Sequence, residues 1–223
     1  QCRQQFQCIA KELERQLLID EGPWLDSTFH SSKLSNPGSL DVIFIPYVER
    51  MNASLTYYKG FSLRQEHPTI NKWLKVLEEL PEYQGTQGDF HTHAHDLPPQ
   101  MGGCWIDPNP NQEQFSKLID SGQGLGKLET CFPLSKYSSN NQPEKIALSR
   151  VLKHRIRIME LNPLKQCRFD QPLRAVLTQM MLKKACQPDK GSALGLRYLR
   201  DRISVPRDMP LLSARILRRA LEL

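Results

Sequence analysis

Three histidines in the segment DFHTHAHD, residues 89–96, have the side-chain type and spacing that most directly suggest chemistry. His91, His93 and His95 recur at every second position, and Cys104 follows downstream. On an extended backbone, alternate side chains point to the same side, so the three imidazoles would converge as the ligands of a divalent metal do. The neighbouring DLPPQMGG is typical of a loop, and spacing without a fixed backbone is weak support for a metal. The segment therefore favours a surface loop with structural histidines over a metal site.

A second candidate site consists of four arginines in GLRYLRDRISVPRDM: Arg197, Arg200, Arg202 and Arg207. A helix would place the first two on adjacent turns, and guanidinium groups suit phosphate or carboxylate ligands. Asp201 and Asp208 offer internal partners, however, and exposed arginines are commonly solvated or paired within the protein. Internal pairing is therefore favoured over an anion-binding site.

The six cysteines are widely spaced and never form a CxxC pair, so neither a zinc ribbon nor a redox motif is indicated. Free thiols in a reducing compartment are the better interpretation. Cys2 and Cys8 lie near Arg3 and Lys11 in sequence, which raises a reactive thiol as an alternative, although inert thiols are commoner. The full set is Cys2, Cys8, Cys104, Cys131, Cys167 and Cys186.

Charge is distributed unevenly along the chain. Residues 143–223 contain 18 Lys and Arg against 7 Asp and Glu, a balance of +11, whereas residues 1–142 contain 12 against 17, a balance of −5. The basic part suggests an acidic protein partner. Nucleic acid is disfavoured because this part has only Phe169 and Tyr198 as aromatic residues for stacking. No apolar run approaches the roughly 20 residues of a membrane-spanning helix, so a soluble protein is expected.

The elements that must position these residues are predicted to be helices. Apolar residues recur at steps of three and four, and Gly or Pro stands at several ends. Asp before Pro suggests helix starts at 170–173 and 208–211, and Ser192 suggests a cap. The remaining predicted helices cover residues 2–20, 40–55, 68–80, 112–119 and 144–161. The second of these is rich in large side chains and is expected to be central to the core.

Between the helical parts, residues 85–142 are dominated by Gly, Pro, Asn, Ser and Gln. This composition predicts an irregular connection with one short helix. The chain is therefore divided into a helical domain at 1–84, the connection at 85–142 and a basic helical extension at 143–223. The fold class expected is all-α.

Three signatures in the first part resemble the C-terminal helical domain of glutathione transferases. GPWLDSTFH, SLDVIFIPYVERM and HPTINKWLKVLEELPEY follow one another in the order of that family, over about residues 6–83. The resemblance implies a transferase-type helical bundle with Trp73 in its core and Asp41 buried at the start of the central helix. The family usually has Ser or Thr three residues before this Asp, whereas Gly38 stands here, which is a weaker cap.

The resemblance also implies what this sequence does not contain. The family binds and activates glutathione through an N-terminal thioredoxin-like domain, which is absent here, so no catalytic residue is assigned and glutathione is expected only with that domain. The chain begins with Gln1 within a helical pattern, which suggests a processed or truncated start. Implied partners are a hydrophobic small-molecule substrate and a second copy in a homodimer. The rival hypothesis is a non-catalytic scaffold that docks an acidic protein.

The expected location is the cytoplasm. HTHAHDLPPQMGGC resembles a segment of transferase-like proteins from cyanobacteria and plastids, so the plastid stroma is the expectation for a photosynthetic eukaryote.

Overall fold

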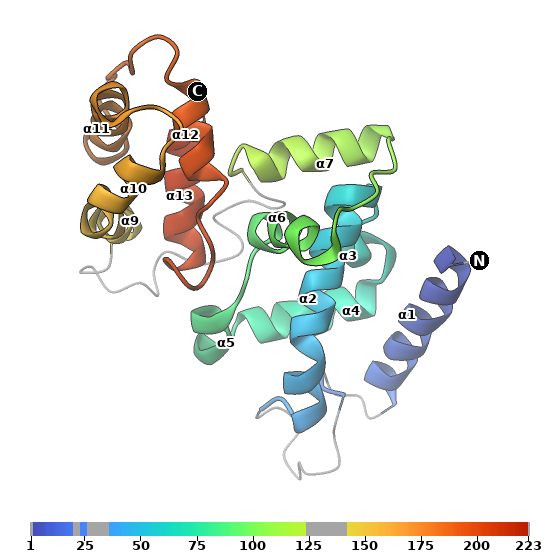
Figure 1. The fold of residues 1–223 in the computed structure, drawn as a ribbon. Helices are drawn as coiled ribbons and strands as arrows, with labels where there is room; N and C mark the ends of the chain where they lie inside the picture. Colours follow the sequence, from blue (N-terminus) through green and yellow to red (C-terminus); the bar gives the residue numbers. More distant parts are fainter. Residues whose placement is uncertain (1, 20–22, 26–35, 124–141, 223) are drawn as a thin grey trace.

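All regular secondary structure in the described part of the chain is helical (Figure 1). The computed structural model describes residues 2–19, 23–25, 36–123 and 142–222. The all-α class is therefore confirmed for these residues, and none of their helices has the length and apolarity needed to cross a bilayer. The helices are α1 (Cys2–Leu18), α2 (Ser39–Lys59), α3 (Leu63–Glu66), α4 (Pro68–Glu78), α5 (Pro81–Thr86), α6 (Phe90–Met101), α7 (Pro110–Asp120), α9 (Pro143–Lys153), α10 (Arg155–Leu161), α11 (Gln166–Leu182), α12 (Ala193–Arg200) and α13 (Leu211–Leu221).

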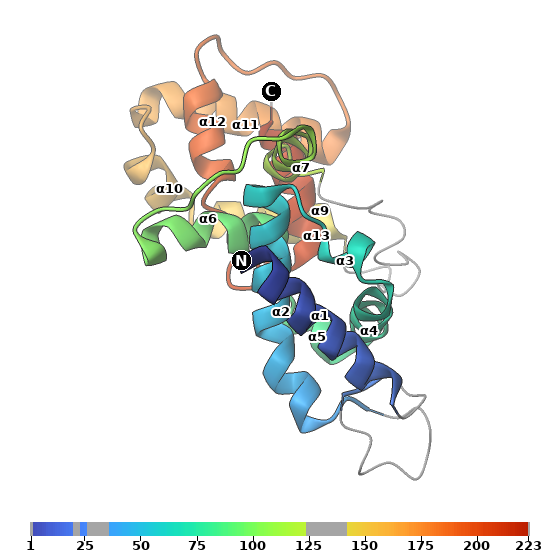
Figure 2. The same cartoon turned by 90° about the vertical axis from the view of Figure 1, so that its right-hand side faces the viewer.

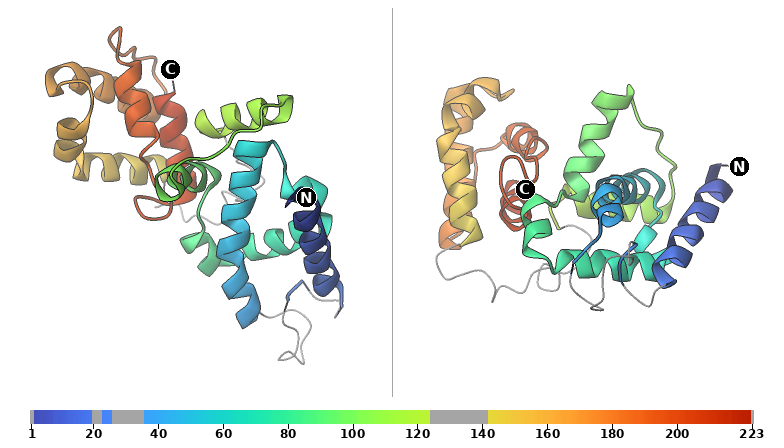
Figure 3. Two further views of the ribbon diagram at one scale, coloured as in Figure 1. Left: turned by 45° about the vertical axis from the view of Figure 1, so that its right-hand side comes forward. Right: turned by 90° about the horizontal axis from the view of Figure 1, so that it is seen from below.

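The first group of helices consists of α1 to α7, and the long helix α2 lies in its middle (Figures 1 and 3). Helix α2 contacts α3, α6 and α7, while α1 packs against α4. Only one side of its N-terminal half enters the core, through Ile45 and Val48. The other large apolar side chains of that half are 44–72% exposed, so the central role expected for the whole apolar pattern holds for part of it only. We call this exposed surface the α2 face; it comprises Leu40, Val42, Ile43, Phe44 and Tyr47.

The second group consists of α9 to α13 and has a hydrophobic core of its own. Helix α13 contacts α9, α11 and α12, and its buried side chains include Ala214, Leu217 and Leu221. The two views at right angles place this group beside the first one, with α6 and α13 near their junction (Figures 1 and 2). The basic extension is thus a packed helical unit in its described residues.

The irregular connection predicted for residues 85–142 needs a partial correction: α7 covers the short helix expected at 112–119, whereas α6 lies where irregular structure was expected. Helix α6 contains the histidine segment, and Asp89 caps it by accepting a hydrogen bond from the Thr92 N–H at 2.8 Å. Pro98 removes the donor that would bond the Ala94 carbonyl, but the Tyr58 hydroxyl donates to that oxygen at 2.8 Å. The missing bond is therefore replaced from α2, and the helix continues through its prolines.

Several predicted helix limits also need correction. The helix expected at 144–161 is interrupted at His154, giving α9 and α10. Helix α11 begins at Gln166, so Pro172 lies inside it, because Phe169 and Leu173 are buried in the second core and hold this turn helical. Helix α13 does begin where expected, but Asp208 accepts a hydrogen bond from the Ser204 N–H instead of capping it.

The start of α6 joins the two groups through a buried ion pair between Asp89 and Arg218. Their side chains are only 4% and 1% exposed. Arg218 also donates to the Ile203 carbonyl at 2.5 Å, and Thr92 Oγ1 accepts from the Val205 N–H at 3.0 Å. Burial opposes ionisation of Asp89, but the Arg218 guanidinium outweighs it and lowers the pKa of Asp89 to about 2. The first group is therefore joined to the second by a buried ion pair and by hydrogen bonds.

Candidate functional site

The histidine segment places two of its three imidazoles in a cluster with a carboxylate. Because residues four apart share a helical face, His91 and His95 lie together on α6, with ring centroids 4.3 Å apart. Asp120, the last residue of α7, joins them, and one potential ligand atom from each residue lies within 4.8 Å of the others. We call these three residues the His–His–Asp cluster. The surface loop expected for this segment is wrong, and so is the extended backbone on which a site of His91, His93 and His95 would depend, since the helix places His93 on another face.

His93 instead approaches Glu49 of α2, with its Nε2 3.8 Å from Glu49 Oε2. It packs closely over Gly88, where an added Cβ would lie 2.3 Å from that ring nitrogen. His93 is thus separated from the cluster and contributes to a different cavity.

Two further residues surround the cluster and orient it. Tyr57 of α2 donates a hydrogen bond to Asp120 Oδ2 at 3.0 Å, while Asp120 Oδ1 lies 2.8 Å from His95 Nε2. Burial, followed by the nearby Asp120 charge, raises the pKa of Tyr57, so its hydroxyl stays protonated and available as a donor. On the other side, Asp201 Oδ1 lies 3.6 Å from His91 Nε2. Asp201 is in turn held by Arg200, whose Nε donates to it at 2.7 Å.

His91 is the least exposed member of the cluster, at 2%. Neither of its ring nitrogens makes a hydrogen bond with any described residue. Burial lowers the pKa of His91, which favours the neutral imidazole. The pKa of Asp201 shifts as well: burial opposes its ionisation, but the hydrogen bond and charge of Arg200 outweigh burial and hold the pKa well below the usual range. A neutral imidazole thus lies between carboxylates with its hydrogen-bonding capacity unused.

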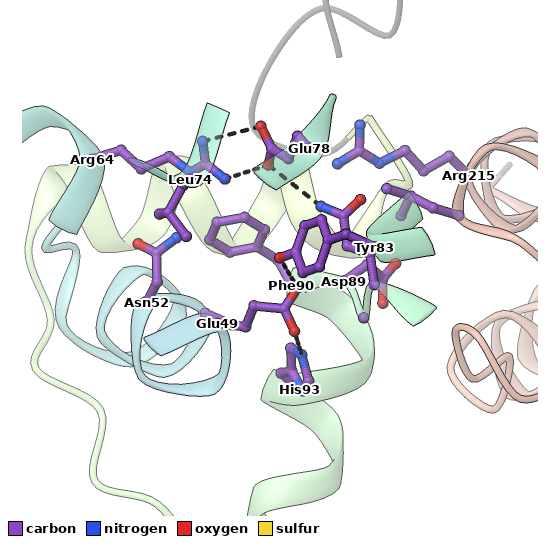
Figure 4. Close-up of a pocket in the computed structure, with 14 residues that line it drawn as sticks. Glu49, Asn52, Arg64, Leu74, Glu78, Tyr83, Asp89, Phe90, His93 and Arg215 are labelled. Atoms are coloured by element: carbon purple, nitrogen blue, oxygen red, sulfur yellow. Dashed lines mark hydrogen bonds and ion pairs between the residues drawn. The ribbon is translucent and has the colours of Figure 1, made fainter. Parts of the chain in front are cut away.

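A polar cavity of about 100 Å³ lies between α2, α4, α6 and α13 (Figure 4). Glu49 accepts a hydrogen bond from Tyr83 and faces His93, while Arg64 pairs with Glu78. Arg215 also extends to its edge. Ligand pockets usually measure about 300–1,000 Å³, so this volume suits a few water molecules. We therefore interpret it as a small polar cavity, below the usual size of a ligand pocket.

The four arginines predicted as an anion site have separate surroundings. Arg200 pairs with Asp201 and Glu222, and Arg207 pairs with its neighbour Asp208. Arg202 stacks on the Tyr198 ring, with its guanidinium carbon 3.5 Å from the centroid. Arg197 is exposed on α12. Anion binding by these four arginines stays a prediction. Arg200, Arg202 and Arg207 already have partners within the protein that would compete with an anion.

The cysteines in the described residues carry free thiols at Cys8, Cys104, Cys167 and Cys186. Cys8 and Cys167 are exposed. Cys131 and the side chain of Cys2 lie outside the described part of the chain, so the alternative of a reactive N-terminal thiol stays a prediction.

The third member of the cluster, Asp120, and the residues beside it, Tyr57 and Asp201, were missed as site residues because they come from distant parts of the chain. One local signal was available: Asp89 can cap a helix, and a helix from residue 90 puts His91 and His95 on one face. Comparison with known protein families, with curated proteins and with solved structures found no match.

Proposed function

We propose that this chain is the C-terminal helical part of a glutathione-transferase-like protein, inactive alone and dependent on a thioredoxin-like domain for glutathione. In the complete protein it would contribute the hydrophobic-substrate side and contacts of a homodimer. The observation that carries the proposal is the environment of Asp41, to which the resemblance assigns a buried structural role at the start of the central helix.

Asp41 is fully buried in the first turn of α2 and accepts hydrogen bonds from three donors among the described residues. Its Oδ1 accepts from the Leu25 N–H at 2.9 Å and from the Trp73 Nε1–H at 2.7 Å. Its Oδ2 accepts from the Gly38 N–H at 2.9 Å. One carboxylate therefore joins the segment before α2, the start of α2 and the middle of α4. This arrangement supports a transferase-type bundle because it links the three resembling signatures at one buried point.

The α2 face gives the proposal a second support. Large contiguous apolar surfaces are uncommon on isolated soluble proteins and often mark contact with another domain or chain. In the proposed protein this face would be covered by the thioredoxin-like domain. Phe44 is a suitable probe because it is 46% exposed while the neighbouring Ile45 points into the core.

The test is to produce the chain fused behind a thioredoxin-like domain, or with any upstream residues of its reading frame, and to measure glutathione binding by calorimetry. We expect the extended protein to bind glutathione and the 223-residue chain to bind none. Phe44→Glu should weaken docking of the upstream domain in the extended protein and leave the helicity of the shorter chain unchanged. Failure of the extended, folded protein to bind glutathione would count against the transferase proposal.

A cavity in the second group favours a second candidate function, docking of an acidic partner. The cavity measures about 260 Å³, and its lining includes the buried Leu217 and the half-buried Ile158. The exposed Arg150, Arg157 and Arg202 also line it. An apolar lining with exposed arginines complements an amphipathic acidic segment, which would insert apolar side chains and place its carboxylates against the arginines.

This candidate predicts salt-sensitive binding of a defined probe. A fluorescent amphipathic peptide with leucines on one face and glutamates on the other should bind, and raising NaCl should weaken its binding steeply because exposed charges are screened. Arg150→Glu with Arg157→Glu should abolish binding measured by fluorescence anisotropy. The matched control, Lys184→Glu with Lys190→Glu, changes charge equally at exposed positions outside this cavity. Binding that ignores salt, or equal loss in the control, would refute docking at this cavity.

A further inference from the structure

The geometry points to a divalent-cation site at the His–His–Asp cluster, with His91, His95 and Asp120 as its protein ligands. Zn²⁺ is the cation that this donor set suits best, because two imidazoles and one carboxylate are common zinc ligands. The site goes beyond the proposed transferase function and does not depend on it.

The first argument is the convergence of three ligands on fixed elements. Two histidines four residues apart on one helix can bind a single metal, as in the HExxH pattern. Here α6 supplies that pair, and the end of α7 supplies Asp120 from the side. Potential ligand atoms within 4.8 Å of one another need only small side-chain movements to surround one ion.

Those movements can be stated from the chemistry of zinc. Ligands 2.0–2.1 Å from a tetrahedral Zn²⁺ are separated from each other by about 3.3 Å. His95 Nε2 and Asp120 Oδ1, now 2.8 Å apart, would therefore open by about half an ångström to admit the ion. Three protein ligands would leave the fourth position to water.

The second argument is the unused capacity of His91. It is buried, and neither ring nitrogen has a hydrogen-bond partner among the described residues. Buried polar groups are normally satisfied, so an orphaned imidazole beside two other potential ligands indicates a missing partner. His95 and Asp120 are each 31% exposed, which gives an ion access from solvent.

The third argument is the presence of orienting residues around the ligands. Tyr57 donates to the Asp120 oxygen that does not face His95. Asp201 faces one nitrogen of His91 at 3.6 Å, as the outer carboxylate does where a histidine binds zinc through its other nitrogen. Such outer contacts fix ligand orientation and commonly change affinity by about 10–100-fold.

The experiment uses the purified chain, stripped of metal with a chelator. We expect it to bind one equivalent of Zn²⁺ by calorimetry. With Co²⁺ as a substitute, we expect the visible absorption bands of a four- or five-coordinate ion and no thiolate-to-cobalt charge-transfer band. His91→Ala and Asp120→Asn should each weaken binding by more than about 100-fold, since they remove direct ligands. The matched control is His93→Ala, which removes an imidazole from the same helix but from a different face.

Circular dichroism establishes that each variant is folded. If His91→Ala is unfolded, the partly exposed Asp120→Asn variant decides the question. The site would be refuted by absence of saturable binding, by retained affinity in folded Asp120→Asn, by equal loss in His93→Ala, or by a thiolate band that assigns the metal to the free cysteines.

Discussion

Replacement of Arg218 by leucine is expected to lower the free energy of unfolding by about 3–5 kcal/mol, because it leaves the Asp89 carboxylate buried without its partner. The loss would be measured by urea denaturation followed by circular dichroism. Arg219→Leu is the matched control, since Arg219 is the next residue of α13 but is exposed. Its effect should stay within about 0.5 kcal/mol.

A second variant separates the charge from the packing of this pair. Asp89→Asn combined with Arg218→Leu should recover part of the loss, because no uncompensated buried charge remains and asparagine can still cap α6.

The stability contributed by this ion pair should depend on pH. The pKa of Asp89 in the folded protein lies below its usual value of 3.8. The ionised carboxylate therefore makes its full contribution to the free energy of unfolding above about pH 4, and this contribution is lost as the pH falls towards 2. A loss below about 1 kcal/mol for Arg218→Leu would contradict a stabilising junction.

Replacement of Asp41 by alanine is expected to cost about 3–4 kcal/mol, since three donors lose their acceptor at one point. Urea denaturation followed by tryptophan fluorescence would measure it. Asp41→Asn should cost less, because one oxygen can still accept from Trp73 and Leu25. Trp73→Phe in both backgrounds gives a double-mutant cycle, and we expect it to cost less in Asp41→Ala than in the parent. Additive losses would show that the Trp73 contact contributes little to the effect.

The sequence predicts the extents of α1, α2 and α4 well because each carries apolar residues at helical spacing and a local start or stop signal, although most of the apolar side chains at the start of α2 face solvent. Pro68, for example, stands at the first position of α4, and Gly60 follows α2 with a φ of +63°. These features are local, so no knowledge of the neighbours is needed to recognise them.

Helix α6 escapes prediction because its continuity depends on a distant group. Pro98 and Pro99 normally argue against a helix, and nothing near them reveals that Tyr58 supplies a hydrogen bond to the Ala94 carbonyl. The same limit applies to the cluster. If residues 90–101 are assumed to be helical, the spacing of His91 and His95 is enough to predict that they share a face. Asp120 cannot be predicted in this way, because its proximity depends on how α7 packs against α6.

The position of α6 has a consequence for cooperativity. Although the described residues contain two hydrophobic cores, the capping residue of α6 is also the counterion of Arg218, so opening one group exposes a charge that stabilises the other. The two halves should therefore melt as a single unit, and the slowest-exchanging amides of α13 should share the protection of those in α6.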